Sequence, residues 1–249
     1  MAEFSTRNII YDYDGTFEGF LCCAFESFTL REIPANILNQ KDFQPGLFEH
    51  FNIITDIEKA NLVKKSIQKK MNAETLVFLE DALLTSLKHK EMFMLDFMRI
   101  GYKTGRKIIN MLADDTVIIL TKAVKQMTHE AHKFTGFTRF SVHGNLLIAK
   151  IKPKNFVLQR IVPHFAARMP NEKFIIYDET HNMICAYAKG KYVISDISDI
   201  KIPEAEAKEY HYRNLWEMFY DTTAIEERKN PKHRIILMPK RYWSNMTEF

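Results

Sequence analysis

The apolar pattern opens with a strand followed by a helix. Residues 7–13 (RNIIYDY) predict a strand, and Asp14-Gly15 predicts the turn that ends it. In residues 17–28 the apolar positions recur at helical spacing and share one face. Thr16 stands where a helix N-cap is expected, and Glu18 falls in the first turn, where a carboxylate stabilises the helix dipole.

The next part of the chain is predicted to be irregular and then helical. Residues 34–50 contain Pro34, Pro45 and Gly46, which favour irregular structure. A long section from about residue 56 to residue 137 keeps apolar residues at helical spacing. Within it, Asn72 and Asp115-Thr116 are the predicted starts of two helices.

The pattern becomes strand-rich after Gly136. Residues 137–153 predict a hairpin that turns at His143-Gly144-Asn145, and residues 155–170 predict a helix that Pro163 must end or kink. Residues 173–197 supply two or three strands, and a helix from about residue 204 precedes a basic tail.

These elements predict an α+β protein, since the strands and helices do not alternate regularly. The expected organisation is an N-terminal strand plus helical section over residues 1–137, followed by residues 138–249. The second part holds an antiparallel β-rich block, C-terminal helices and the basic tail. The two parts are expected to pack as one compact unit.

Charge is distributed unevenly along the 249 residues, although the net charge is only +4. Residues 1–60 carry a net charge of −6, residues 61–160 carry +10, and residues 161–249 are neutral. This distribution favours a surface that faces a polyanion. No apolar run approaches the roughly 20 residues that cross a membrane, and no signal peptide is evident, so we expect a cytoplasmic protein.

The three cysteines do not predict a metal or redox site. Cys22 and Cys23 are adjacent, Cys185 is distant, and no C-x-x-C pair occurs. We therefore expect buried apolar thiols and no cofactor.

The run Asp12-Tyr13-Asp14-Gly15-Thr16 is typical of haloacid dehalogenase phosphatases, in which Asp12 would be the nucleophile and Asp14 the acid/base. That mechanism needs further motifs on neighbouring strands. Residues 117–121 imitate one, but their apolar pattern continues at helical spacing. Asp178 imitates another, with Asn182 where a second carboxylate is wanted. The phosphatase is therefore a minor alternative to a simple strand-to-helix turn.

Two basic segments carry candidate nucleic-acid contacts. If Met127 faces the core, the opposite helix face holds Lys122, Lys125, His129, His132 and Lys133. This face is either ordinary solvated surface or a phosphate contact, and the three-residue spacing of its histidines disfavours a metal site.

The tail from Arg228 to Arg241 has six Lys/Arg and no acid, and it runs into Tyr242-Trp243. Cations beside aromatic rings can contact phosphates and stack on bases. Alternatively, Tyr242 and Trp243 dock the tail onto the core while Arg241 pairs with a carboxylate.

Four segments together resemble one bacterial family. They are residues 13–28 (YDGTFEGFLCCAFESF), 130–140 (EAHKFTGFTRF), 164–187 (HFAARMPNEKFIIYDETHNMICAY) and 223–243 (TAIEERKNPKHRIILMPKRYW). This family comprises uncharacterised proteins assigned to DNA metabolism or DNA repair. Its members are commonly encoded beside a radical-SAM protein of DNA modification or repair, and some are fused to a uracil-DNA-glycosylase-like domain.

The resemblance implies DNA and the radical-SAM protein as partners, but it implies no reaction. The family pattern begins at Tyr13, so Asp12 lies outside it. The chain also lacks the C-x-x-x-C-x-x-C site of a radical-SAM enzyme.

Three functional hypotheses follow. The leading one is a DNA-binding component of a repair or modification system that acts with a separate enzyme. Its contacts would come from Lys122, Lys125, His129, Lys133, Arg139, Arg228, Lys229, Lys232, Arg234, Lys240, Arg241, Tyr242 and Trp243. The second is a nucleic-acid-processing enzyme, with candidate acid/base groups Asp14, Glu18, His132, Asp178 and His181. The third is a protein adaptor that docks through residues 92–102 (MFMLDFMRIGY), for which an ordinary core role is the favoured alternative.

Overall fold

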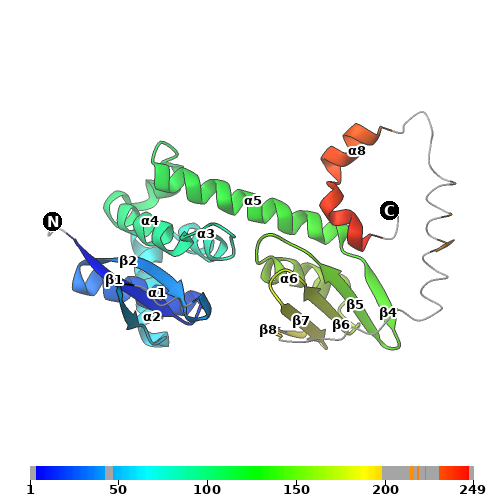
Figure 1. Ribbon diagram of the computed structural model, residues 1–249, viewed down its shortest axis with the longest axis horizontal. Helices are drawn as coiled ribbons and strands as arrows, with labels where there is room; N and C mark the ends of the chain where they lie inside the picture. The colour runs from blue at the N-terminus through cyan, green and yellow to red at the C-terminus, as the bar shows by residue number, and fades with distance from the viewer. Residues whose placement is uncertain are drawn as a thin grey trace. The chain divides into compact units, whose positions relative to one another are not determined.

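The chain folds into two compact units, which the computed structural model places at residues 1–127 and 128–249 (Figure 1). The structure describes residues 4–42, 47–197, 214, 215, 218, 222 and 230–246. The division falls inside α5 (Asp115–Phe137), earlier than the expected boundary after residue 137. The predicted α+β class is confirmed, with an antiparallel-rich sheet and helices in the C-terminal part.

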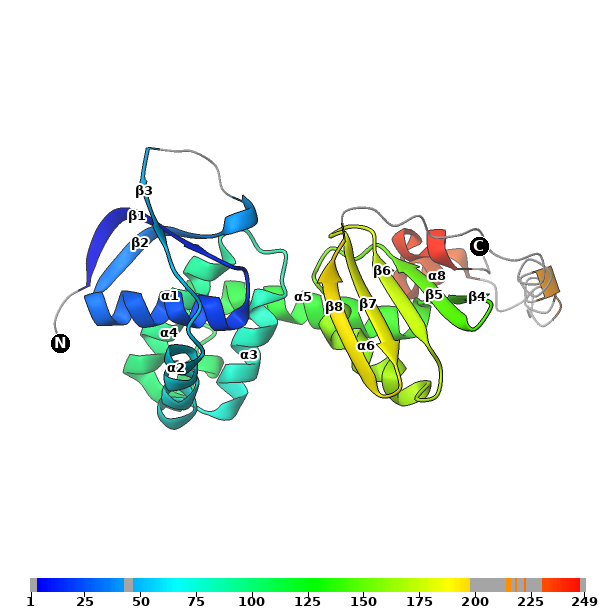
Figure 2. The same ribbon diagram turned by 90° about the horizontal axis from the view of Figure 1, so that it is seen from below.

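The first unit contains a parallel three-stranded sheet, which lies to one side of its helices in Figure 2. Its strands are β1 (Ser5–Tyr13), β2 (Glu32–Asn39) and β3 (Glu49–Asn52), in the order β2-β1-β3. The expectation of irregular structure over residues 34–50 was wrong, because it missed β2 and β3. Pro34 is tolerated because β2 is an edge strand, where a missing N–H need not break a ladder.

Helices cover this sheet and begin where the sequence predicts. α1 (Phe17–Leu30) is capped by Thr16, whose hydroxyl accepts from the N–H of Gly19. Asn72 caps α3 in the same way. The bounds of the remaining helices are α2 (Ile57–Lys70), α3 (Ala73–Leu83), α4 (Lys90–Thr104), η1 (Gln40–Asp42) and η2 (Gly105–Asn110).

The core of the first unit contains the segment that was considered for a protein adaptor. Met94, Leu95, Phe97 and Met98 on α4 are fully buried and belong to this unit's hydrophobic core. The ordinary core role of residues 92–102 is therefore confirmed. Cys22 and Cys23 are buried in the same core, as expected, and burial raises the pKa of both thiols.

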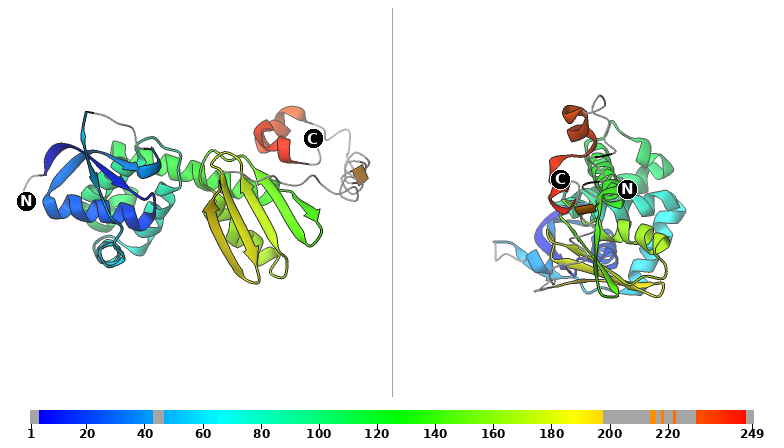
Figure 3. Two further views of the ribbon diagram at one scale, coloured as in Figure 1. Left: turned by 60° about the horizontal axis from the view of Figure 1, so that its bottom comes forward. Right: turned by 90° about the vertical axis from the view of Figure 1, so that its right-hand side faces the viewer.

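The second unit contains a five-stranded sheet in the order β4-β5-β6-β7-β8, seen side by side in Figure 3 (left panel, green to yellow). In its described strands, β5 and β6 pair in parallel and the other neighbours pair antiparallel. The bounds are β4 (Phe140–His143), β5 (Leu146–Ile151), β6 (Phe174–Asp178), β7 (Met183–Ala188) and β8 (Lys191–Asp196). The predicted hairpin turn at residues 143–145 is confirmed.

The helix α6 (Leu158–Arg168) crosses from β5 to β6 and covers one face of the sheet (Figure 1). Pro163 was expected to end or kink this helix, but it lies inside it. Pro163 and Gln159 are both exposed, so water can bond the Gln159 carbonyl that Pro163 leaves without a donor.

Segments far apart in the sequence complete the second core. Ala131 and Phe134 of α5 pack with α6 and the sheet, as do Tyr242 and Met246. Tyr242 lies in η4 (Lys240–Asn245), and Met246 follows it directly. η4 comes after α8 (Pro231–Leu237) in the chain. The helix predicted from residue 204 lies outside the described residues. Among the described helices, none has the length and apolarity needed to span a bilayer.

Candidate nucleic-acid interface

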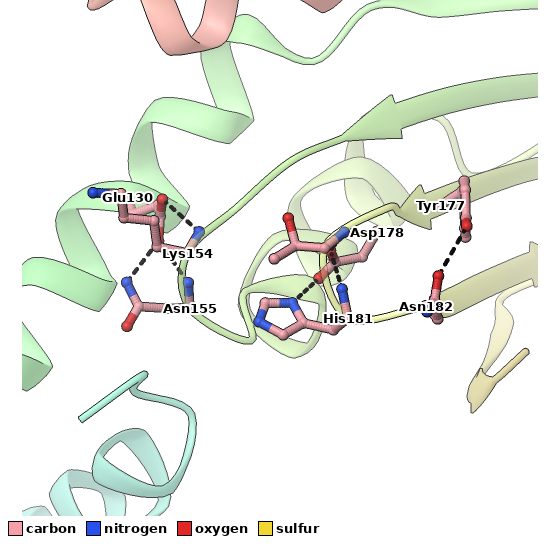
Figure 4. A network of polar contacts seen from close by, with 8 residues as sticks. Glu130, Lys154, Asn155, Tyr177, Asp178, His181 and Asn182 are labelled. Atoms are coloured by element: carbon pink, nitrogen blue, oxygen red, sulfur yellow. Dashed lines mark hydrogen bonds and ion pairs between the residues drawn. The ribbon is translucent and has the colours of Figure 1, made fainter. Parts of the chain in front are cut away.

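A buried carboxylate on α5 organises one end of the second unit (Figure 4). Glu130 is 3% exposed. Its Oε1 accepts from the backbone N–H of Lys154 at 3.0 Å, and its Oε2 accepts from the backbone N–H and the side-chain amide of Asn155 at 2.9 and 2.6 Å. Arg241 Nη2 lies 2.9 Å from Oε1. The buried charge is thus both paired and hydrogen-bonded, as burial requires.

A second buried carboxylate holds a histidine. Asp178, at the end of β6, has no solvent exposure, and its Oδ1 accepts from the backbone N–H groups of Thr180 and His181. Its Oδ2 lies 2.6 Å from His181 Nδ1. Because an ionised carboxylate can only accept, Nδ1 carries a proton, and in the neutral ring Nε2 has the lone pair.

Both carboxylates fix the loop that joins β5 to α6. Glu130 holds the backbone at Lys154 and Asn155, and the ring of Phe156 lies 4.0 Å from the imidazole of His181 between centroids. The side chains of Lys152 and Lys154 remain exposed on this loop. Lys152 also contacts Glu179 at 3.0 Å, an ion pair in which Lys152 is exposed and Glu179 is partly buried. The loop therefore presents Lys152 and Lys154, and Glu130 holds the backbone at Lys154.

The C-terminal segment docks onto the unit's core. Tyr242 is 4% exposed and packs against Phe134 and Phe137 with centroid distances of 5.1 and 5.2 Å. Trp243 donates its indole N–H to the carbonyl of Met238. The guanidinium of Arg241 lies over the Tyr242 ring and pairs with Glu130. These contacts are the ones that the docking alternative describes, and the contact of this segment with nucleic acid stays a prediction.

The other predicted tail cations are placed as follows. Lys232 and Lys240 are exposed and Arg234 is partly buried. The charges of Arg234 and Lys240 lie 5.5 and 5.9 Å from the centroid of the Trp243 ring, at cation–π distance. Arg228 and Lys229 lie outside the described residues.

The predicted basic face of α5 is exposed. Met127 is fully buried, while Lys122, Lys125, His129 and His132 are exposed. Lys133 is partly buried, with its charge 5.9 Å from the Tyr242 ring. Arg139 donates to the carbonyls of Gly136 and Thr138.

Charge is strongly asymmetric in the described part of the second unit. Residues 128–197 and 230–246 contain 14 Lys and Arg but only five Asp and Glu. Two of those five acids, Glu130 and Asp178, are buried and engaged inside the unit. Few acids remain at the surface, although Arg241 and Lys152 are themselves paired with Glu130 and Glu179.

The candidate acid/base residues are only partly brought together. Asp178 and His181 form a pair, whereas His132 is exposed on α5. Asp14 and Glu18 belong to the first unit and have local partners. Burial alone would raise the pKa of Asp14, but hydrogen bonds from Thr16 and Thr55 lower it.

Glu18 makes a 2.6 Å ion pair with Lys64, which lowers the pKa of the carboxyl group. Asp12, the would-be phosphatase nucleophile, is buried beside His50 at 2.7 Å. The segments that imitated its partner motifs are elsewhere, since Thr121 lies in α5 and Asp178 in the other unit's sheet. The phosphatase motifs therefore do not share one sheet.

The sequence did not identify Glu130, Asn155 or Phe156 as residues of the candidate site. A signal did exist, because Glu130 is three residues from Met127 and four from Phe134, which places it on the apolar face of α5. An acid on a buried helix face needs specific partners. Its partners lie some 25 residues away on a loop without a motif, so they could not be named.

A family model described as a domain of unknown function, DUF4130, matches residues 88–248. This match covers more than half of the chain, so the chain belongs to this uncharacterised family. It spans the end of the first unit and nearly all of the second, including Glu130, Asp178 and Arg241. No curated protein matches the chain. Among the described residues, no group of three or more His, Cys, Asp or Glu side chains is arranged to hold a metal ion.

Proposed function

We propose that this protein binds DNA through the second unit, as a component of a repair or modification system that acts with a separate enzyme. The observation that carries the proposal is the excess of 14 cations over five acids, of which two are internal. A surface of this kind attracts phosphates and releases counterions on binding.

The geometry of the β5–α6 loop supports phosphate contact. Lysine side chains on a flexible loop lose backbone entropy when they bind, and a loop that is already fixed avoids that cost. Here Glu130 accepts a hydrogen bond from the backbone N–H of Lys154, and the ring of His181 packs against Phe156 on the same loop. The exposed His129 and His132 on α5, and Lys232 and Lys240 in the tail, add positive or potentially positive groups to the same unit.

The test measures binding of the full chain to fluorescent single- and double-stranded DNA by anisotropy at several salt concentrations. Affinity should fall linearly on a log–log plot, with a slope of roughly −0.9 per neutralised phosphate for duplex DNA. Changing Lys152 and Lys154 together to Gln should reduce the slope by about 2. Lys103→Gln and Lys107→Gln in the first unit serve as the matched control. Absence of binding at low salt would refute the proposal.

The identity of the partner enzyme rests on the family resemblance, which associates these proteins with a radical-SAM DNA modification or repair protein. The co-expressed pair should bind DNA more tightly than either protein alone. Equal affinities for the pair and for the free proteins would remove this part of the proposal without affecting DNA binding itself.

A second candidate function is nucleic-acid processing, and the Asp178–His181 pair favours it. Asp178 fixes the imidazole so that Nε2 can accept a proton from an attacking water. Purified protein should then cleave or modify a DNA substrate, and His181→Gln should abolish this. Activity unchanged in His181→Gln would exclude the role of His181.

A further inference from the structure

The five-stranded sheet of the second unit has one face that its described helices cover and one that they leave open. Ala149, Ile176 and Cys185 pack with α6 in the second core, and the strand pairing places them on one face. Figure 2 shows the opposite face turned toward the viewer, with α6 behind the strands. We call this opposite face the outer sheet face and define it by Ile148, Lys150, Tyr177, Ile184, Lys191 and Val193.

The strand register shows that these six residues share one face. Lys150 is the Cα partner of Tyr177, and Tyr177 is the partner of Ile184. Val193 is the partner of Ala186, which lies two residues from Ile184 on β7. The remaining two residues each lie two positions from one of these on the same strand. Because side chains alternate along a strand and paired residues point to the same side, all six project away from the second core, to which none of them belongs.

Charge is segregated between the two faces of this sheet. Its five strands contain two lysines, Lys150 and Lys191, and both are exposed on the outer sheet face. The same strands contain two acids, Asp178 and Asp196, and both pair with Met183 on the face that carries the core. Within the part of the chain that the structure describes, neither lysine forms an ion pair. The outer sheet face therefore presents positive charge that no acid of the sheet neutralises.

The spacing of the two lysines favours a polyanion as the ligand. Lys150 on β5 and Lys191 on β8 are separated by three strand spacings. Lys150 lines up through the register with Ser195, which is four residues from Lys191. At about 4.8 Å per strand and 3.3 Å per residue, the two positions are roughly 20 Å apart. A single phosphate group cannot reach both, whereas a nucleic acid carries a charge on every nucleotide.

Tyr177 adds an aromatic ring to this positive surface. The ring is partly exposed, and its hydroxyl donates to Asn182 Oδ1 at 3.2 Å, which holds one edge in place. Ile184 lies beside it in register, and Val193, which is 68% exposed, extends the apolar surface to β8. Cations beside an aromatic ring on an open sheet can bind phosphates while the ring stacks on a base.

The width of the sheet favours an unpaired strand over a duplex. Five strands measure about 19 Å across, whereas the major groove of B-DNA is about 12 Å wide. The outer sheet face therefore cannot enter the groove, and Tyr177 cannot reach bases that are stacked inside a duplex. A single strand can lie across the face with its bases turned toward the ring.

We propose that the outer sheet face binds single-stranded DNA, with a base stacked on Tyr177 and phosphates paired with Lys150 and Lys191. This inference rests on the proposed DNA binding of the second unit. It adds the form of the DNA and the surface that receives it, which lies apart from the β5–α6 loop that carries Lys152 and Lys154.

The test measures binding of the full chain to a fluorescent oligodeoxythymidine and to a mixed-sequence duplex of the same length, by anisotropy over a series of salt concentrations. The variants are Tyr177→Ala, Tyr177→Phe and Lys150→Gln. Tyr192→Ala is the matched control, because Tyr192 is also exposed but lies on the other face of the same sheet, paired with Tyr187. Circular dichroism checks that each variant is folded.

We expect Tyr177→Ala to weaken binding of the single strand about tenfold and to leave duplex affinity unchanged. Tyr177→Phe should bind as the unchanged chain does, because the ring is kept. Lys150→Gln should reduce the salt slope for the single strand by about 0.7, the value for one lost phosphate contact. Tyr192→Ala should have none of these effects.

The two proposals fail in different ways. Single-strand affinity that survives Tyr177→Ala, or a salt slope that Lys150→Gln leaves unchanged, would overturn the outer sheet face while the DNA binding of the unit stands. Equal losses of single-strand and duplex affinity in Tyr177→Ala would also overturn it, since stacking on an unpaired base would not be the cause. Absence of binding to both DNA forms would remove both proposals. A dimer in light scattering that Val193→Lys dissociates would replace the DNA strand with a second copy of this chain.

The slope of Lys150→Gln decides the matter if Tyr177→Ala does not fold, because Lys150 is exposed and its replacement leaves the sheet's packing intact.

Discussion

Arg241 Nη2 lies 2.9 Å from Glu130 Oε1, and this contact joins the C-terminal segment to the middle of α5. The same carboxylate accepts three hydrogen bonds from Lys154 and Asn155. One buried side chain thus connects three segments that the sequence separates widely. Its replacement should affect the whole second unit.

Glu130→Ala should destabilise the protein by about 3 kcal/mol, because it leaves buried N–H donors without an acceptor and removes the partner of Arg241. Glu130→Gln keeps an acceptor oxygen and should cost less, about 1–2 kcal/mol. Urea unfolding followed by circular dichroism measures both. Glu172→Ala, at an exposed position of the same unit, should change stability by less than about 0.5 kcal/mol. An equally small effect of Glu130→Ala would contradict the network's role.

Two glycines should respond to alanine with opposite signs. A Cβ on Gly19 would lie 2.3 Å from Asp14 Oδ1 and 2.8 Å from Thr55 Oγ1, so Gly19→Ala should cost about 1–3 kcal/mol. A Cβ on Gly136, inside α5, would meet no atom within 4 Å. Gly136→Ala should therefore stabilise the protein by about 0.5–1 kcal/mol. Thermal unfolding of the two variants should shift the midpoint in opposite directions.

Tyr13 should make folding sensitive to alkaline pH. Burial is the main reason that the pKa of Tyr13 is raised in the folded state. The negative charge of Glu91, which accepts a hydrogen bond from the Tyr13 hydroxyl at 2.9 Å, raises this pKa further. The unfolded chain therefore ionises first as the pH passes about 10, so stability that is complete below this pH falls above it.

Tyr13→Phe should cost about 1 kcal/mol near neutrality through the lost hydrogen bond, and it should flatten the fall in stability above pH 10. Urea midpoints between pH 8 and pH 11 measure this slope. Tyr192→Phe, at an exposed position on β8, should leave the slope unchanged. Because burial also raises the pKa of Tyr11, part of the slope remains in Tyr13→Phe, and a slope as steep as in the unchanged chain would assign the alkaline loss to other groups.

Asp14 should contribute to stability in the opposite pH range. Its pKa is lowered in the folded state, since the hydrogen bonds from Thr16 and Thr55 outweigh the effect of burial. Its contribution is therefore present above about pH 4 and is lost as the pH falls through the folded pKa. Asp14→Asn should reduce stability at pH 6 and weaken the decline toward pH 3, as monitored by chemical unfolding. The exposed Glu172→Gln should show neither change.

Local sequence signals predicted an element well where the interactions that start or end it are made by residues close together in the sequence. Thr16 and Asn72 cap their helices because the side chain bonds a backbone N–H three residues on. The short strands β2 and β3 escaped prediction because their stability comes from pairing with β1, which no local pattern records.

The candidate site shows the same limit. The pairing of Asp178 with His181 spans three residues and both were candidates from the sequence. The contacts of Glu130 with Asn155 and Arg241 and the burial of Tyr242 depend on tertiary structure, which no local pattern records. The basic character of this part of the chain could be predicted from composition, but the burial of Glu130 and Asp178 could not.

The burial of Tyr242 and Met246 has a consequence for synthesis on the ribosome. These residues belong to the same core as strands that end at Asp196, so that core stays incomplete until about 50 further residues have been added. At roughly 5–20 residues per second this takes several seconds. During that interval the apolar faces of α6 and the sheet remain partly uncovered, and the nascent chain is a natural client for chaperones.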